Sequence, residues 1–119
     1  MDGVDATRGR SPRDGEVQVV ETAGRQVVRP FGHADFEQGE ELAAALDEAL
    51  RAGGGRVVVD LGRLAFADST FLHLLVRAAA RGEVHLAGPL APDVRRLFDI
   101  TGLTPLFRFH ADLDSALVP

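Results

Sequence analysis

Residues 56–72 constrain the fold of this 119-residue chain more than any other segment. Three consecutive valines, Val57 to Val59, are apolar on both faces of an expected strand. That pattern is typical of a central strand that is covered on both sides and runs parallel to a neighbour. Asp60 ends the strand, and after a short link Asp68-Ser69-Thr70 opens an apolar run with helical spacing. The segment therefore predicts a strand that returns as a helix, as in α/β folds.

The remainder of the chain repeats this alternation of strands and helices. Strands are expected at residues 16–21, 25–29, 84–87 and 106–109, and helices at residues 40–51, 92–101 and 112–118. The order β-β-α-β-α-β-α-β-α predicts one α/β domain over residues 16–119, with a mixed, largely parallel sheet flanked by helices and the first strand antiparallel at an edge. Residues 1–15 mix Asp, Gly, Arg, Ser and Pro without a hydrophobic period, so we expect a disordered tail there.

Composition excludes several classes of function. The chain has no cysteine, which removes thiolate catalysis and cysteine-ligated metals, and all 13 basic residues are arginine, which removes lysine-based phosphate binding and Schiff-base chemistry. A formal net charge of −5 and the absence of Trp and Tyr argue against a nucleic-acid partner. No segment approaches the ~20 apolar residues that cross a bilayer, and the N-terminus lacks a signal-peptide core. We therefore expect a cytoplasmic protein without membrane contact.

Ser69 is the residue with the clearest functional alternative. It stands on the first turn of the expected helix, accessible to solvent and at the positive end of the helix dipole, with no catalytic base beside it. The plain explanation is that Asp68, Ser69 and Thr70 are all residue types that cap helices. The functional alternative is phosphorylation, which would add roughly −1.5 to −2 charges at a site that the dipole tolerates. The fold should survive this charge, whereas a partner matched to the neutral hydroxyl should not bind it.

Other titratable residues have structural explanations. Asp60 ends a central strand, as the phosphoacceptor aspartate of a receiver domain does. Such a site needs a downstream lysine, which this chain lacks, so we expect Asp60 to cap the following turn. The histidines show no metal-ligand spacing, and we expect a packed side chain at His85 and exposed ones at His33 and His73. No G-x-S-x-G motif surrounds Ser69, as a hydrolase would require. We accordingly predict no catalytic residues, no cofactor and no metal.

The pair Arg95-Arg96 lies on the expected third helix beside Asp93 and Asp99. A pair of this kind usually belongs to a solvated face with local ion pairs. An anion or nucleotide site is the alternative for these residues.

Four stretches carry a resemblance to a known family. They are Gly32-His33-Ala34-Asp35, Val57-Val58-Val59-Asp60-Leu61 running on to Phe66-Ala67-Asp68-Ser69-Thr70, Leu86-Ala87-Gly88-Pro89, and Val94-Arg95-Arg96-Leu97-Phe98-Asp99-Ile100-Thr101-Gly102-Leu103. In this order and spacing they resemble the STAS domains of bacterial anti-sigma-factor antagonists. The resemblance implies a mixed sheet of four to five strands flanked by helices, and a non-enzymatic role in transcription regulation.

The resemblance also implies a partner-switching mechanism. In the family, the serine directly after the motif aspartate is phosphorylated by a partner that is both an anti-sigma factor and an ATP-dependent serine kinase; that position here is Ser69. The unmodified domain binds the kinase and frees the sigma factor, phosphorylation breaks the complex, and a serine phosphatase resets it. The partner-facing surface combines the loop that holds Asp35 with the start of the Ser69 helix. The implied contact residues are Gly32, His33, Asp35, Asp68, Ser69, Thr70, Phe71 and His73.

The sequence departs from the family pattern next to the predicted phosphosite. The family usually has Gly-Leu-Gly or a similar sequence after the serine pair, where this chain has Phe71-Leu72-His73. The segment from Asp68 to Gly88 is also several residues shorter than usual. These departures motivate an alternative: a STAS module that acts as a scaffold in a multiprotein signalling or transport complex without being phosphorylated.

Overall fold

A five-stranded sheet forms the centre of the protein in the computed structural model, which describes residues 11–118. Its strand order is β1-β2-β4-β6-β7. The strands are β1 (Val17–Thr22), β2 (Arg25–Pro30), β4 (Arg56–Asp60), β6 (Glu83–Ala87) and β7 (Arg108–His110). β1 pairs with β2 antiparallel at the edge, and every other neighbouring pair in this sheet is parallel. The predicted α/β class, with a mixed and largely parallel sheet, is confirmed.

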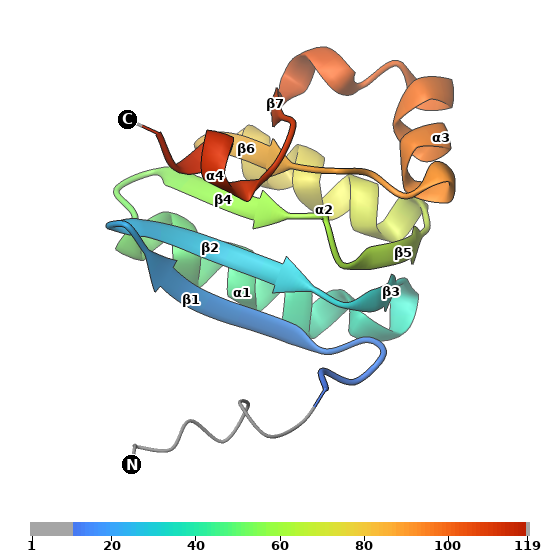
Figure 1. Cartoon of the computed structure of the whole chain (residues 1–119), viewed down its shortest axis with the longest axis horizontal. Coiled ribbons are helices and arrows are strands. Elements are labelled where there is room, and N and C mark those ends of the chain that lie inside the picture. Colours follow the sequence, from blue (N-terminus) through green and yellow to red (C-terminus); the bar gives the residue numbers. More distant parts are fainter. Residues whose placement is uncertain (1–10, 119) are drawn as a thin grey trace.

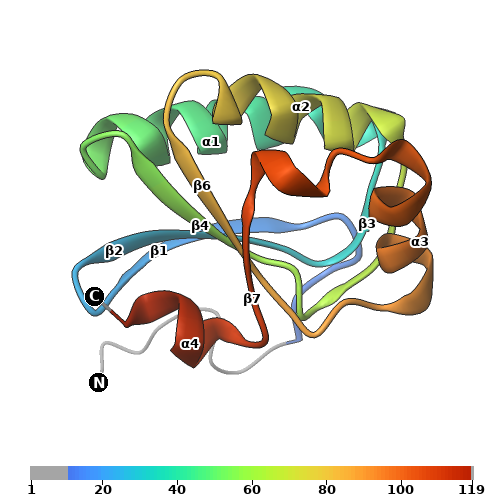
Figure 2. The ribbon, with the colours of Figure 1, turned by 90° about the horizontal axis from the view of Figure 1, so that it is seen from above.

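Helices cover the two faces of the sheet unequally. The long helices α1 (Gly39–Ala52) and α2 (Ser69–Ala79) lie side by side on one face, whereas the five-residue helix α4 (Leu113–Leu117) lies against the other (Figures 1 and 2). Helix α3 (Pro92–Thr101) packs at the end of the sheet near β5 (Leu64–Ala67). One face of the sheet is therefore deeply buried, and the other keeps polar side chains among a small apolar cluster.

The three valines of β4 explain why this strand is central. Val57 and Val59 are fully buried in the larger core with α1 and α2, and Val58 is 1 % exposed in a smaller core on the opposite face. The smaller core is completed by Val27, Ala87 and Ala116, the last of which belongs to α4. Burying apolar side chains on both faces is the property that the sequence indicated for this strand.

The structure contains a second sheet that the sequence pattern did not indicate. Strands β3 (Gly32–Ala34) and β5 pair in parallel, where we expected a loop and a short link. Strands this short show no clear alternation; in β5 the two end residues are buried and the two middle residues are exposed. The last strand also begins at Arg108 instead of residue 106, because Thr104–Leu106 forms a 3-10 helix, η2.

Part of the N-terminal segment contacts the domain. The Gly15 nitrogen donates to the Phe31 oxygen at 2.8 Å, and Asp14 contacts His33. Residues 1–10, on which most of the predicted tail falls, lie outside the described residues. Within residues 11–118, no helix is long and apolar enough to cross a membrane.

Candidate functional site

The small parallel sheet brings together the two loops that were predicted to form one surface. Ala34 of β3 pairs with Ala67 of β5, and the Asp68 nitrogen donates to the Ala34 oxygen at 3.3 Å. The residues that follow this pair are Asp35 and Asp68, which leave the ends of adjacent strands. Each of these aspartates is the N-cap of the helix that follows it. The pairing therefore sets the Asp35 loop directly beside the start of α2.

Asp68 caps α2 and leaves Ser69 exposed. The Asp68 Oδ1 atom accepts hydrogen bonds from the backbone nitrogens of Thr70 at 2.9 Å and Phe71 at 3.3 Å. Ser69 is the first residue of α2, and its hydroxyl has no hydrogen-bond partner among the described residues. Capping is thus assigned to Asp68 and not to the serine. A free hydroxyl at a helix N-terminus is chemically open to modification.

Asp35 holds a short 3-10 helix, η1 (Phe36–Gln38), through a capping box. Its Oδ1 atom accepts from the Glu37 nitrogen at 3.0 Å, and its own nitrogen donates to Gln38 Oε1 at 2.9 Å. The box presents Phe36 to solvent with 80 % of its surface exposed. A hollow of about 410 Å³ separates Phe36 from Thr70 and is also lined by Glu37, Gly39 and Glu40.

Phe36 is the surface residue that sequence reasoning missed. We placed it at the end of a loop and assigned it no role. The signal that could have found it is the spacing of Asp35 and Gln38, which matches a capping box and indicates that the residue after the cap is held in place. A large apolar side chain held in water beside a candidate contact surface is typical of an interface anchor.

Gly32 and His33 support the Asp35 loop from the N-terminal side. Gly32 has a φ of +71°, and a Cβ there would overlap the Asp14 carboxylate. Asp14 Oδ1 accepts from the His33 nitrogen at 2.8 Å and lies 2.9 Å from His33 Nδ1. These contacts raise the pKa of His33 and lower the pKa of Asp14. The structural role of Gly32 is therefore to leave room for the carboxylate that orients His33.

The contact role predicted for Phe71 needs correction. Its side chain is 1 % exposed and packs in the larger core, so it faces away from any partner. The departure from the family pattern at this position therefore does not crowd Ser69. His73 is exposed, as predicted, and lies one helical turn after Ser69.

Two further predictions about buried polar residues are confirmed. Asp60 is 5 % exposed, and its Oδ1 atom accepts from the Gly62 nitrogen at 3.0 Å, so it caps the turn that follows β4. Its Oδ2 atom lies 3.2 Å from Arg29 Nε in an ion pair. His85 is buried at 8 % exposed. Among the described residues, no group of three or more candidate metal ligands comes together.

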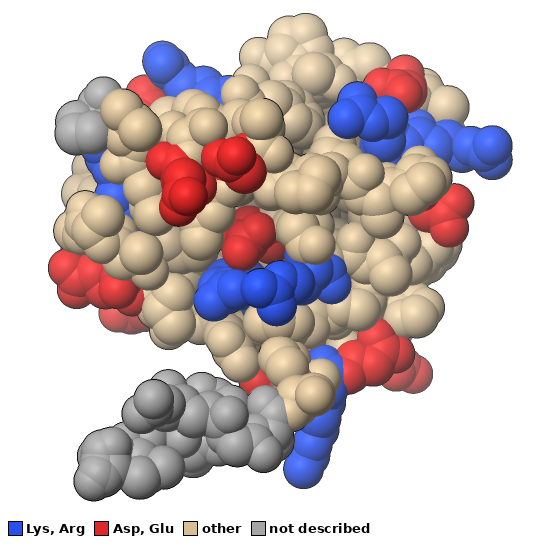
Figure 3. Space-filling model, viewed as in Figure 1, with Lys and Arg blue, Asp and Glu red and all other residues tan. Residues whose placement is uncertain are grey.

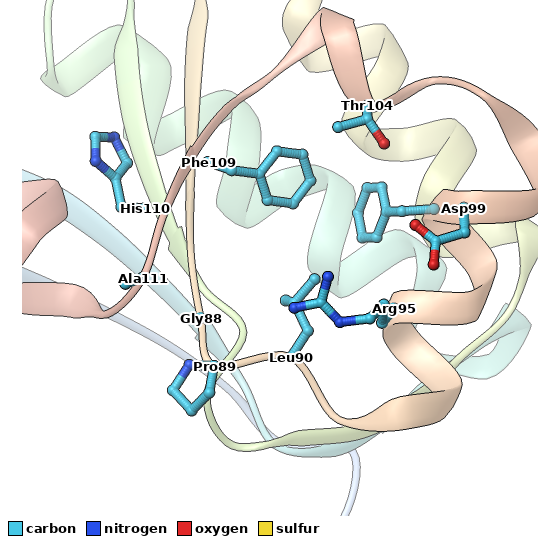
Figure 4. A pocket seen from close by; sticks show the side chains of 10 residues that line it. Gly88, Pro89, Leu90, Arg95, Asp99, Thr104, Phe109, His110 and Ala111 are labelled. Carbon is cyan, nitrogen blue, oxygen red and sulfur yellow. The ribbon is translucent and has the colours of Figure 1, made fainter.

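A separate pocket of about 380 Å³ lies at the ends of β6 and β7, beside α3 (Figure 4). Arg95 extends from α3 towards Leu90, and the ring of Phe109 points inward. Arg96 is not among the lining residues, so the two arginines do not act together there. Asp99 also lines the pocket and offsets the charge of Arg95, which argues against a dedicated anion site.

Charged side chains of both signs are interspersed over the face that carries α4 (Figure 3). A row of basic side chains crosses the middle of this face, with acidic groups directly beside it.

A known protein family matches most of this chain. The model of a family described as "Mlab, STAS domain" matches residues 17–108, which contain the sheet, the Asp35 loop and Ser69.

The chain belongs to the STAS-domain family.

Its homologues among STAS proteins are anti-sigma factor antagonists, which are regulators and not enzymes. BtrV of Bordetella bronchiseptica, by its name a candidate anti-sigma factor antagonist, is 35 % identical over 81 residues, covering 64 % of this chain and 69 % of BtrV. The crystal structure of an anti-sigma factor antagonist from Mycobacterium paratuberculosis is 27 % identical with a TM-score of 0.72, covering 86 % of this chain and 90 % of that chain.

SpoIIAA is similar in an unphosphorylated and in a phosphorylated form. The unphosphorylated anti-sigma factor antagonist SpoIIAA is 27 % identical with a TM-score of 0.65, covering 85 % of this chain and 93 % of SpoIIAA. The phosphorylated Bacillus protein is 25 % identical with a TM-score of 0.61, covering 85 % and 96 %. The STAS domain described above thus has the SpoIIAA-like fold.

Proposed function

We propose that this STAS protein is a cytoplasmic anti-sigma factor antagonist that binds an anti-sigma serine kinase and is released when that kinase phosphorylates Ser69. The observation that carries the proposal is the free, exposed Ser69 hydroxyl at the first position of α2, beside a cap that Asp68 supplies. A relative of the same fold, SpoIIAA, exists in unphosphorylated and phosphorylated forms. A serine phosphatase would return the protein to its binding state.

The local electrostatics support release by phosphorylation. A phosphate on Ser69 would stand at the start of an 11-residue helix, whose dipole favours negative charge, so α2 should stay folded. The same phosphate would lie next to Asp68 on a surface that also carries Glu37 and Glu40. A partner that fits the neutral hydroxyl would have to bury this additional charge without a matching cation, which costs several kcal/mol.

The proposed contact surface is built from the two loops that β3 and β5 bring together. It consists of His33, Asp35, Phe36, Asp68, Ser69, Thr70 and His73, which we call the switch face. Gly32 supports this surface by accommodating Asp14, and Phe71 is left out because it is buried.

Phosphorylation by a cognate anti-sigma serine kinase tests the proposal. The purified protein is incubated with the kinase and ATP, and the modified residue is located by mass spectrometry. We expect phosphate on Ser69, full loss of modification in Ser69→Ala, and retained modification in the matched variant Ser115→Ala, at an exposed serine of α4 outside the switch face. Unchanged modification of Ser69→Ala would exclude Ser69 as the acceptor. A stable complex that ATP does not affect would instead support the scaffold role.

A further inference from the structure

Two histidines on neighbouring strands form a hydrogen-bonded pair away from the switch face. His85 lies on β6 and His110 on the edge strand β7, and His85 Nδ1 is 2.9 Å from His110 Nε2. The two rings are stacked with centroids 5.1 Å apart and an interplanar angle of 17°. The ring of His110 points to the side of β7 opposite to Phe109, away from the pocket beside α3 (Figure 4).

The protons of this pair are fixed by a third residue. His85 Nε2 lies 2.9 Å from Glu83 Oε1, and His85, Arg56 and Arg108 together lower the pKa of Glu83 to about 2. The carboxylate is therefore ionised and can only accept, so the hydrogen bond requires His85 Nε2 to be the donor. In the neutral pair, the lone pair of His85 Nδ1 then accepts a hydrogen bond from the Nε2–H group of His110.

One added proton is compatible with this bond, and two are not. A first proton can sit on the free Nδ1 of His110, or on His85 Nδ1 with His110 Nε2 accepting; either arrangement keeps one donor facing one acceptor. When both rings are charged, an N–H group of each ring points at the other across 2.9 Å. The hydrogen bond is then replaced by repulsion between two cations in a partly buried site.

We propose that His85 and His110 act as a one-proton lock on strand β7: the strand is held on β6 while the pair carries at most one added proton, and it is released when both rings are protonated. The lock lies on the partly covered face of the sheet. Burial and the nearby cations His85 and Arg108 lower the pKa of His110. This direction agrees with a pair that binds a second proton less readily than the first.

The charged groups around the pair come from three strands. β4 contributes Arg56 and β6 contributes Glu83, joined by an Nε–Oε1 contact of 2.8 Å, while β7 contributes Arg108, whose Nη2 lies 3.3 Å from Glu83 Oε2. Helix α4 directs apolar residues toward the smaller core, and its acids Asp112 and Asp114 are exposed. Among residues 11–118, Glu83 is thus the one carboxylate that contacts the pair, and it also contacts Arg56 and Arg108.

Release of β7 would also loosen α4. β7 has three residues and one neighbouring strand, and α4 follows it directly and packs against both β6 and β7. Ala116 of α4 covers Val58 and Val27 in the smaller core. Acidification should therefore expose this apolar cluster at the C-terminal end before the larger core unfolds.

Amide hydrogen exchange by NMR on the full chain, from pH 7 to pH 5, tests the lock. When β7 is released from β6, the two histidines bind two protons near pH 6.5, whereas the docked pair binds one added proton. Release of β7 therefore becomes easier as pH falls. We expect protection factors of Phe109 and His110 to fall about tenfold more than those of Val58 and Val59 over this range. The imidazole nitrogen shifts should report two separate titrations for the pair, because the second proton is added to a site that already carries one.

Variants separate the lock from general acid sensitivity. His110→Gln offers either an N–H or a C=O group to His85, so it should keep β7 protected at pH 5. The matched change His73→Gln, at an exposed histidine on α2, should leave the tenfold loss in place. If His110→Gln does not fold, the imidazole nitrogen shifts of the unmodified protein provide the test on their own. Independent titration of both rings near pH 6.5, or equal loss of protection in β7 and β4, would overturn the proposal.

Discussion

Asp68 Oδ1 accepts a hydrogen bond from the backbone nitrogen of Thr70 at 2.9 Å. This bond caps the helix across Ser69 and does not involve the Ser69 hydroxyl. The residue that stabilises the helix start and the residue that carries the proposed chemistry are therefore different. This separation permits Ser69 to gain or lose a phosphate while the cap stays in place. It also allows stability and partner binding to be changed independently by mutation.

The separation predicts unequal effects of two neighbouring alanine substitutions. Asp68→Ala should lower the free energy of unfolding by about 1 kcal/mol, because two backbone N–H groups lose their acceptor. Ser69→Ala should change it by less than about 0.5 kcal/mol, since the hydroxyl has no partner among the described residues. Urea denaturation measures both values. Asp68→Asn is the control and should retain most of the cap; an equal loss in all three variants would contradict this assignment.

The ion pair between Arg29 and Asp60 should contribute to the free energy of unfolding because it is partly buried. Asp60→Ala leaves the partly buried Arg29 guanidinium without its carboxylate and removes the cap on Gly62, so we expect a loss of about 3 kcal/mol. Arg29→Met should cost less in the Asp60→Ala background than in the unmodified protein. A double-mutant cycle in urea gives the coupling energy. Additive effects of the two substitutions would show that the pair is not coupled.

The contact between Asp14 and His33 should make the switch face weakly sensitive to pH. Asp14 raises the pKa of His33, so the stabilisation is present below the unfolded value near pH 6.5 and is lost as pH rises through the folded value. The lowered pKa of Asp14 means that the same contact is also lost in strong acid. NMR titration of His33 should give a lower pKa in Asp14→Asn than in the unmodified protein. An unchanged value would mean that the contact does not form in solution.

Phe36 should contribute to partner binding and little to folding. With 80 % of its surface exposed, Phe36→Ala should leave the free energy of unfolding within about 0.5 kcal/mol. If Phe36 inserts into the kinase, the same change should weaken the complex about tenfold or more. Val19→Ala, at an exposed residue of edge strand β1, is the matched control and should leave affinity unchanged. Calorimetric titration with the kinase measures the affinity of each variant. Equal affinities of Phe36→Ala and the unmodified protein would remove Phe36 from the switch face.

The elements that the sequence predicted well are those with a long or pronounced pattern. The valines of β4 identified a central strand, and the helix expected at residues 40–51 corresponds to α1. The valines are buried, as are Leu42, Leu46, Ala49 and Leu50 on the inner face of α1. The short strands β3 and β5 were missed because three or four residues do not show a period. Those two strands position the switch face, so its geometry could not be predicted, although His33, Asp35, Asp68, Ser69 and Thr70 lay in recognised motifs.

The errors within the site have a similar cause. Phe71 entered the contact residues through the family resemblance, although it opens an apolar run with helical spacing. The structure follows the helical spacing and places its side chain in the core. Phe36 was overlooked because its exposure depends on the capping box around Asp35, a local geometry that hydrophobic periodicity does not report.

The most direct test of the central claim is the affinity of the kinase for this protein with phosphoserine incorporated at position 69, measured beside the unmodified protein. We expect a native circular dichroism spectrum and melting transition for both, with the phosphorylated form binding at least about 100-fold more weakly. Equal affinity of two well-folded forms would contradict it.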